Sequence, residues 1–517
     1  MRYIYGFVLI FTLLLWSSCR KDFESVPSSG NLEFSQDTIF LDTIFTNIGS
    51  STRTLKVYNR SSEDINIPNL QLSSGESSSY RLNVDGIPGK IFQDINILAN
   101  DSIFVFIETT IDIDNFPNPD NSYLYEDRIV FDSGTNTQDV NLITLVKDAV
   151  FLFPEQSSDG TVETLNLGTE EEPILIEGFY LNDNQLNFTN EKPYVIYGYA
   201  AVAPNKTLIV EPGARIHFHR DSGILVANTA SMKSIGLVSS DPELMENQII
   251  FEGDRLEPSF ADVPGQWGTI WLTAGSTNHE FSYTTIKNSI VGILMDSNDG
   301  DRTLSLKNVE IYNTSNIGLL ARTGDIYGEN LIINNSGQSS LSCSLGGKYN
   351  FIHSTFVNYW TNNFRIFPAV SIDNVLQIGE NEFITSDLIE ANFINCIVYG
   401  NEARELIFTQ SQEAAFNFNF KNSLIRFDDP NGNFEDDLNY DFLNESLYLN
   451  IVRNQNPSFL NTTLNDFNIE TEVSGADGIG DPSDALTVPL DGNGTSRNVS
   501  APDAGAYESI IYPDEGT

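Results

Sequence analysis

The chain has 517 residues, of which 71 are acidic and 27 basic, so its formal net charge is -44. A field of that sign repels nucleic acids, which excludes a nucleic-acid partner. Only three cysteines occur, Cys19, Cys343 and Cys396, too few for a disulfide framework. We expect Cys343 and Cys396 to be buried free thiols, with a single disulfide bridge as the alternative.

Residues 1–18 carry the features of an export signal. Arg2 supplies a positive start, residues 4–16 form an apolar run too short to span a membrane comfortably, and Cys19 follows two serines. This segment resembles a bacterial lipoprotein signal peptide, which implies that Cys19 is lipidated after cleavage and holds the protein on a membrane. Trp16 stands where a leucine is usual, so an uncleaved anchor or an ordinary signal peptide is the alternative.

The next segment is predicted to be a tether followed by a first domain. Residues 19–30 end in a run rich in Ser, Pro and Gly, which is typical of a tether. Residues 31–150 contain short alternating strands between turn clusters, for example around Ile103, Val105 and Ile107. This spacing predicts a β-sandwich. It resembles the immunoglobulin-like modules of bacterial surface proteins, which implies a spacer.

Residues 151–172 are predicted to be a linker, and a different pattern follows them. Residues 207–226 show three short extended segments, separated by turns at Pro212 and at Asp221. Strands this short cannot bury their apolar faces alone. They need stacked copies of themselves, which predicts a solenoid.

Copies of this unit recur along the chain. Alternating apolar residues are followed by a polar position, and successive copies begin 22, 23, 42 and 27 residues apart, at Leu304, Ile326, Tyr349, Ala391 and Phe418. The polar position is occupied by Asn308, Asn330, His353, Asn395 and Asn422. Asparagine tolerates left-handed backbone angles, and its amide can bond the same position one coil away. The long spacing predicts one full coil plus an insertion at residues 360–390.

These repeats resemble a right-handed parallel β-helix of the pectin-lyase-like class. The stretches VEPGARIHF (residues 210–218), GDRLEP (253–258) and VPGQWGTIWL (263–272) resemble β-helix lipoproteins of the Bacteroidota cell envelope. NQNPSFL (454–460) and PDAGAYE (502–508) are similar to the C-terminal closure of such proteins. The resemblance implies an all-β chain with the β-helix at residues 173–450. Residues 451–517 would then be a closing segment and tail over the open end.

One polar strand suggests a metal site. Arg215, His217 and His219 alternate with apolar residues and should face outward together. His217, His219 and Asp221 are candidate ligands, with Glu252 of a neighbouring coil as a further one. A solvated polar face without metal is the alternative. No cofactor is otherwise indicated, although the acidic composition would suit calcium.

Aromatic residues suggest a surface for sugar rings. Trp267 and Trp271 share a face if their strand is regular, and exposed indoles stack on the apolar faces of pyranoses. The glycan-binding candidates are Trp267, Trp271, Trp360 and Arg215. Packing of the tryptophans into the core is the alternative.

A further cluster precedes the insertion. His353, Tyr359 and Arg365 would supply an acid-base group, an aromatic surface and a cation, as a polysaccharide lyase requires. His353 also occupies the asparagine position, so stabilisation of a turn is its other role.

We therefore expect a monomeric, lipid-anchored β-helix protein of the bacterial outer membrane. Its expected function is non-catalytic glycan binding, adhesion or scaffolding at the cell surface. The alternative is a polysaccharide lyase or glycoside hydrolase that acts on the lateral face of the β-helix, an inference from fold alone.

Overall fold

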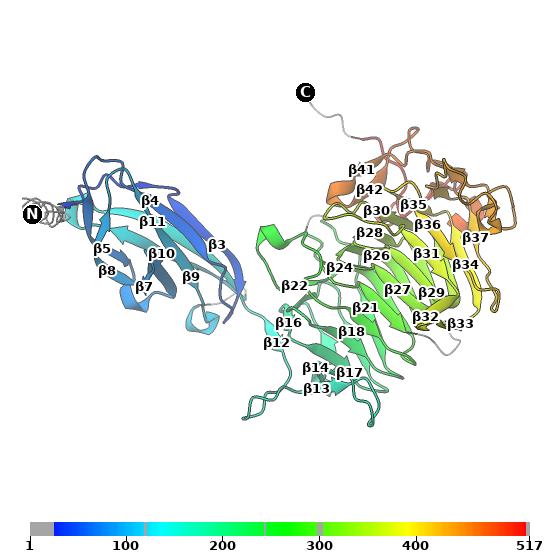
Figure 1. The fold of residues 1–517 in the computed structure, drawn as a ribbon, viewed down its shortest axis with the longest axis horizontal. Coiled ribbons are helices and arrows are strands. Elements are labelled where there is room, and N and C mark those ends of the chain that lie inside the picture. The colour runs from blue at the N-terminus through cyan, green and yellow to red at the C-terminus, as the bar shows by residue number, and fades with distance from the viewer. Residues whose placement is uncertain (1–24, 118–120, 242–243, 297–302, 513–517) are drawn as a thin grey trace, which may run out of the picture. The chain divides into compact units, whose positions relative to one another are not determined.

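The computed structural model describes residues 25–117, 121–241, 244–296 and 303–512 (Figure 1). The predicted signal peptide and Cys19 therefore lie outside the described residues. The chain forms two compact units, Met1–Asp148 and Ala149–Thr517. Both are built from β-strands, and in the described part of the chain no helix has the length and apolar character needed to cross a membrane.

The first unit contains two sheets that share one hydrophobic core. The predicted strand around Ile103, Val105 and Ile107 is confirmed, and all three side chains are buried. One sheet consists of β1 (Val26–Pro27), β5 (Ile65–Leu72), β10 (Ser122–Phe131), β11 (Gln138–Lys147) and β3 (Thr38–Phe45), with β8 (Ile91–Ile97) beside β5. The other consists of β2 (Glu33–Phe34), β4 (Arg53–Tyr58), β9 (Ser102–Thr109), β6 (Tyr80–Val84) and β7 (Ile87–Gly89).

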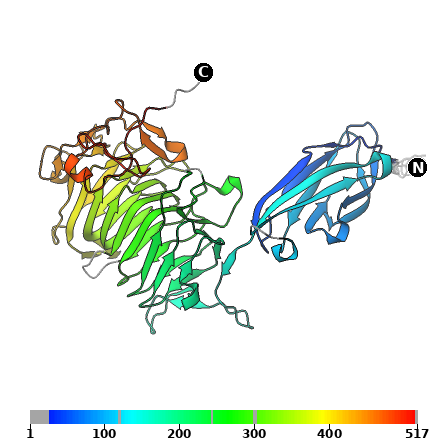
Figure 2. The ribbon, with the colours of Figure 1, turned by 180° about the vertical axis from the view of Figure 1, so that it is seen from behind.

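The second unit is a stack of mostly parallel strands in which most strands pair with their equivalents one coil later (Figures 1 and 2). Successive coils lie about 4.8 Å apart, as in any β-ladder. The pairings form three ladders along the stack, the hydrogen-bonding pattern of a parallel β-helix.

The first ladder contains β12 (Val150–Leu152), β16 (Tyr194–Ile196), β19 (Arg215–Phe218), β22 (Ile249–Gly253), β24 (His279–Lys287), β26 (Leu304–Thr314), β28 (Ile332–Ser336), β30 (Thr355–Asn358), β35 (Ile397–Gly400), β38 (Leu424–Ile425) and β40 (Val452–Arg453). The second contains β14 (Leu175–Tyr180), β17 (Tyr199–Val202), β20 (Gly223–Val226), β23 (Ile270–Leu272), β25 (Ile293–Asp296), β27 (Leu319–Glu329), β29 (Leu341–Ile352), β31 (Val370–Asp373) and β36 (Leu406–Thr409). The third contains β15 (Asn187–Phe188), β18 (Thr207–Val210), β21 (Ser231–Ile235), parts of β24, β26, β27 and β29, then β34 (Leu388–Ile394), β37 (Asn419–Lys421) and β39 (Tyr448–Leu449).

The register agrees with the repeats predicted from the sequence. Leu304 pairs with Ile326, Ile326 with Tyr349, and Tyr349 with Ala391. The 42-residue spacing arises because the intervening coil carries an antiparallel hairpin, β32 (Val375–Gly379) and β33 (Glu382–Thr385). Another antiparallel pair joins β13 (Thr164–Asn166) to β14 near the first coil.

The asparagine ladder is also present. The five residues at the polar position all have positive φ, between 48° and 52°. Asn330 donates to Asn308 Oδ1 at 2.8 Å, and Asn395 Nδ2 lies 2.9 Å from His353 Nε2. The ladder thus fixes the tight turn between the third and first ladders in successive coils. Cys343 and Cys396 are buried free thiols, as predicted.

The C-terminal segment does not lie where the sequence suggested. We define residues 455–511 as the strap; it includes β41 (Phe459–Asn461), β42 (Asp466–Ile469) and α2 (Pro482–Ala485). Its apolar side chains pack on the outer side of the first ladder, where Ile332, Val357, Ile397 and Leu424 would otherwise be exposed. Strands buried on both faces read as continuous apolar runs, as these do. The strap therefore covers a lateral face (Figures 1 and 2).

The end of the stack is closed by residues 428–450 instead. Tyr440, Phe442 and Phe434 pack against the core aromatic residues of the last coils. Phe427 lies 4.8 Å from Tyr440, and Phe442 lies 4.6 Å from Tyr448, between ring centroids. Aromatic side chains of residues 428–450 thus cover the apolar end of the solenoid. The strap instead packs on its lateral face.

Candidate functional site

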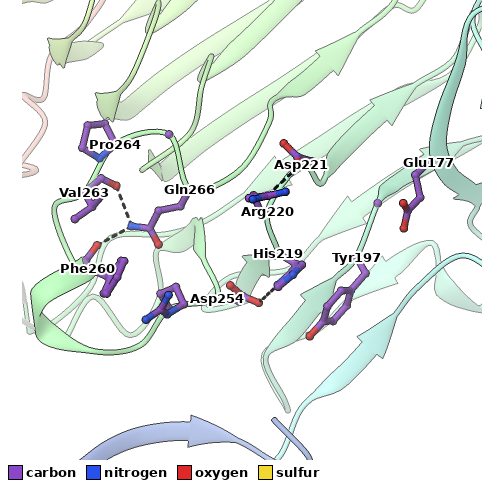
Figure 3. Close-up of a pocket in the computed structure, with 13 residues that line it drawn as sticks. Glu177, Tyr197, His219, Arg220, Asp221, Asp254, Phe260, Val263, Pro264 and Gln266 are labelled. Atoms are coloured by element: carbon purple, nitrogen blue, oxygen red, sulfur yellow. Dashed lines mark hydrogen bonds and ion pairs between the residues drawn. The ribbon is translucent and has the colours of Figure 1, made fainter. Parts of the chain in front are cut away.

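A cavity of about 660 Å³ opens at the turns between the first and second ladders in the first coils of the stack (Figure 3). We call it the turn pocket. Its lining residues are Glu177, Tyr197, Gly198, His219, Arg220, Asp221, Asp254, Arg255, Phe260, Val263, Pro264, Gly265 and Gln266. Glu177 belongs to β14, and the other lining residues come from three consecutive turns, so the solenoid brings together residues that lie far apart in the sequence.

His219 is the centre of the turn pocket. It follows β19, and its Nδ1 lies 2.8 Å from Asp254 Oδ2, which accepts a hydrogen bond from the imidazole (Figure 3). The imidazole also stacks on Tyr197 of the preceding coil, with centroids 4.6 Å apart and planes inclined by 29°. Tyr197 and Asp254 therefore fix the orientation of the imidazole, although the His219 side chain is 49% exposed.

Charged residues surround this ring pair. Arg220 Nε lies 3.0 Å from Asp221 Oδ2, and both side chains are highly exposed. Arg255 pairs with Glu257 at 2.8 Å and lies over the Phe260 ring, 3.9 Å from its centroid. The pocket thus offers cations and carboxylates beside aromatic surface.

A loop between β22 and β23 forms one wall of the turn pocket. Gln266 donates to the carbonyl oxygens of Phe260 at 2.7 Å and Val263 at 2.9 Å (Figure 3). Asn288, one coil on, donates to Val263 O at 2.9 Å. These amide contacts hold the loop in one shape, and a rigid loop gives the pocket a defined wall.

The chemistry available here is stacking, hydrogen bonding and proton transfer. Partial burial, together with the negative charge of Asp254, raises the pKa of Tyr197, so its hydroxyl stays protonated at neutral pH. An imidazole oriented through Nδ1 by a carboxylate presents Nε2 for proton transfer. Glu177 and Asp221 are the other carboxylates of the lining.

The predicted metal ligands do not converge on one point. His217 is buried, with Nδ1 3.2 Å from Gly253 O and 3.7 Å from Glu252, whereas His219 pairs with Asp254. Burial opposes ionisation of Glu252, but His217 and Lys287 outweigh it and hold its pKa below the usual value. Within the described ranges, no group of three or more His, Cys, Asp or Glu side chains is arranged to hold a metal ion.

The tryptophans do not form the predicted platform. Trp267 is fully buried, stacks on Phe218 at 4.2 Å and donates from Nε1 to Lys287 O. Trp271 is partly exposed and donates to Asp296 Oδ2 at 2.7 Å. The two differ because Trp267 precedes the regular strand β23, so alternation does not apply to it.

The polar groups of Trp360 and Arg215 also form hydrogen bonds within the protein. Trp360 is 4% exposed and donates to Asn363 Oδ1 at 2.8 Å. The Arg215 guanidinium donates to the carbonyl oxygens of Gln248 and Met245, at 2.6 and 2.7 Å. Burial lowers the pKa of Arg215. Its hydrogen bonds connect β19 to the segment before β22, so the guanidinium is not available to a glycan.

The cluster before the insertion is also inaccessible at His353 and Arg365, which are buried, whereas Tyr359 is partly buried. His353 has no exposed surface, and burial together with nearby Arg497 lowers its pKa far below the usual value. Tyr359 lies under the strap, stacked on Phe467 at 6.4 Å. Arg365 is enclosed with Glu405. The expected accessible acid-base cluster is therefore absent at these three residues, because the strap and the loop before β31 cover them.

Sequence reasoning selected His219 and Asp221 but missed Tyr197, Asp254 and Arg255. Asp254 and Arg255 lie within GDRLEP, a stretch that we used only for the family resemblance. Tyr197 follows the apolar run of β16. One signal was available: Tyr197, His219 and Asp254 each directly follow a strand of the first ladder. The repeat is irregular in these coils, so the sequence alone does not show that the three positions are equivalent.

Comparison with models of protein families finds no match, and comparison with curated proteins finds none. Among solved structures, the chain is similar to the catalytic unit of a GH87 alpha-1,3-glucanase from Streptomyces thermodiastaticus, with 11% identity, a TM-score of 0.23, and coverage of 77% of this chain and 88% of that one. A family 123 glycoside hydrolase from Clostridium perfringens matches with 12% identity and a TM-score of 0.16, over 22% of this chain and 26% of its own. The E. coli chaperone DraB matches with 14% identity and a TM-score of 0.16, over 24% and 58%. These similarities are too low to support an argument about function.

Proposed function

We propose that the protein is a cell-surface glycan-binding protein and that the turn pocket is its binding site. The observation that carries the proposal is the stacked pair of Tyr197 and His219 beside the charged side chains of an open cavity of about 660 Å³. Sugar rings present apolar C–H faces to aromatic rings and hydroxyl groups to charged side chains. A pocket with a few polar groups around an apolar surface is the usual form of such a site.

The proposal includes the architecture that would present this pocket. The second unit would be a right-handed parallel β-helix, a proposal that rests on the three ladders and on the repeat pattern. The first unit would be an immunoglobulin-like β-sandwich acting as a spacer, supported by its two sheets around one core. Cys19 would anchor the chain to the bacterial outer membrane through lipid.

The anchor has its own test. Metabolic labelling with a fatty-acid analogue should mark the full-length protein, and Cys19→Ala should lose both the label and its place in the membrane fraction. Cys343→Ala serves as the matched control, because it also removes a thiol. Unchanged membrane fractionation of Cys19→Ala would refute the anchor.

A second candidate function is catalysis at the same pocket. The specific observation in its favour is the His219–Asp254 pair, an oriented imidazole that can act as a general base on a saccharide. The lyase or hydrolase alternative would then act at His219 rather than at the buried His353. Binding remains the first proposal because it requires only the surface that the pocket presents.

One experiment separates the two functions. A soluble chain of residues 25–517 is incubated with neutral and acidic polysaccharides, and both retention and release of reducing ends are measured. Retention without release supports binding. Release that Asp254→Asn abolishes, with retention preserved, supports catalysis. Neither retention nor release with any polymer in the panel would refute both.

A further inference from the structure

A second set of cavities lies at the far end of the coil stack, under residues 428–450. Two adjoining cavities, of about 600 and 260 Å³, share Glu435, Tyr440, Phe442 and Arg453 in their walls. We call them together the end pocket. The turn pocket belongs to the first coils, whereas these residues follow the last ones, so the two sites are separate.

The end pocket has an aromatic floor and an apolar rim. Phe427, Phe434 and Tyr440 contact one another, with ring centroids 4.8 to 5.6 Å apart, and Phe442 packs beside them. Leu438 and Leu443, at the mouth of the larger cavity, are 80% and 92% exposed. Together with the rings behind them, these leucines give the mouth an apolar surface that an apolar stem of a ligand would cover.

Carboxylates outnumber cations in these walls. The acidic lining residues are Asp428, Asp429, Glu435, Asp437 and Asp441, whereas Arg453 is the single lining cation among the described residues. Oδ1 of Asp429 is buried without a hydrogen-bond donor, and the nearest guanidinium, that of Arg404, is 3.8 Å away. The excess of carboxylates over cations therefore makes these walls favourable for a cationic ligand.

The pocket already holds guanidinium groups on its rings. Arg453 lies over the Phe442 ring, 4.5 Å from its centroid, and Arg404 lies over Phe434 at 5.1 Å. Both contacts are cation–π interactions, which aromatic rings beside carboxylates favour. The floor is therefore electrostatically suited to organic cations.

We propose that the end pocket binds an organic cation with a primary ammonium group on an alkyl stem. The stem would lie on Leu438 and Leu443, and the ammonium would contact Glu435 and the neighbouring carboxylates of the walls. A lysine side chain of a partner and a free diamine share this chemistry. A bare divalent ion would gain nothing from the rings and leucines, and the net charge of -44 attracts cations to the molecule as a whole.

The test is calorimetric titration of the chain spanning residues 25–517 with 1,6-diaminohexane, a short oligolysine peptide and calcium chloride. Glu435→Gln removes one carboxylate shared by both cavities and should weaken amine binding about fivefold, since one close charge contact is lost. Arg453→Gln removes the competing cation and should strengthen binding by a similar factor. Glu445→Gln, an exposed carboxylate outside the lining, should change nothing.

The two variants should change the amine affinity in opposite directions. Loss of folding can only weaken binding, so the tighter binding expected of Arg453→Gln cannot arise from misfolding. Tighter binding of the diamine than of the peptide assigns the site to a small amine, and the reverse assigns it to a lysine of a partner. Equal loss in Glu435→Gln and Glu445→Gln would show only diffuse attraction and would overturn the proposal. Binding of calcium in preference to both amines would overturn it too.

Discussion

The guanidinium of Arg365 lies 2.7 Å from the Glu405 carboxylate, and both side chains are almost completely enclosed. Two Arg365 nitrogens contact the two carboxylate oxygens, and Glu405 also accepts the Ala369 N–H at 2.7 Å. Burial raises the pKa of Glu405, while Arg365 opposes that shift. The pair thus connects the loop before β31 to the next coil.

Removing one partner of this pair should therefore destabilise the protein. Arg365→Met leaves a buried carboxylate without its cation, which costs about 3–5 kcal/mol. Urea unfolding measures the loss. Arg60→Met breaks an exposed pair with Glu33, which solvent screens, so the loss of stability should be much smaller. Similar losses for the two variants would contradict the buried arrangement.

Trp267 should behave as a core residue. Trp267→Ala removes a fully buried indole stacked on Phe218, so the expected loss is about 3–5 kcal/mol in the free energy of unfolding. Trp271→Ala, which removes a partly exposed indole, should cost clearly less. Thermal and urea unfolding of the two variants give the comparison. A larger loss of stability for Trp271→Ala than for Trp267→Ala would contradict the core position of Trp267.

His353 should be replaceable by asparagine. The residue has φ of 48° and occupies the ladder position that asparagine fills in the neighbouring coils. His353→Asn should therefore change stability by less than about 1 kcal/mol, whereas His353→Val adds a β-branched residue at positive φ and should cost at least about 2 kcal/mol. Equal melting temperatures for the two variants would argue against the ladder role.

The strap should make stability depend on pH through Asp503. Burial, opposed by the Gly478 and Ser509 amides and assisted by the charge of Glu508, raises the Asp503 pKa to about 6. A carboxyl whose pKa is higher in the folded state stabilises the fold fully below its unfolded value of about 4. This contribution is lost as the pH rises through 6. The slope for one proton is at most about 1.4 kcal/mol per pH unit.

The measurement is urea unfolding between pH 4 and pH 7. Asp503→Asn should flatten the decline across this window, because the amide does not titrate. Asp148→Asn provides a matched control in the first unit. An undiminished slope in Asp503→Asn would place the titration elsewhere.

The regular part of the fold could be predicted because period-two alternation and a polar position recur at a nearly fixed spacing. The pairing of Leu304, Ile326 and Tyr349 follows directly from that repeat. The path of the strap could not be predicted, since strands buried on both faces show only that something covers them. The site was only partly predicted. His219 was selected for its alternation, but its contact with Asp254 depends on a loop whose conformation is fixed by Gln266 and Asn288.

The most direct test of the account compares the affinity of Tyr197→Ala and of the parent chain for the polysaccharide that the panel retains. Tyr197→Ala should weaken retention about tenfold at unchanged melting temperature, because it removes the ring that stacks on His219. Tyr180→Ala, which removes an exposed tyrosine outside the turn pocket, should bind as the parent chain does. Equal retention of the parent chain and Tyr197→Ala would contradict the assignment of the turn pocket as the glycan-binding site.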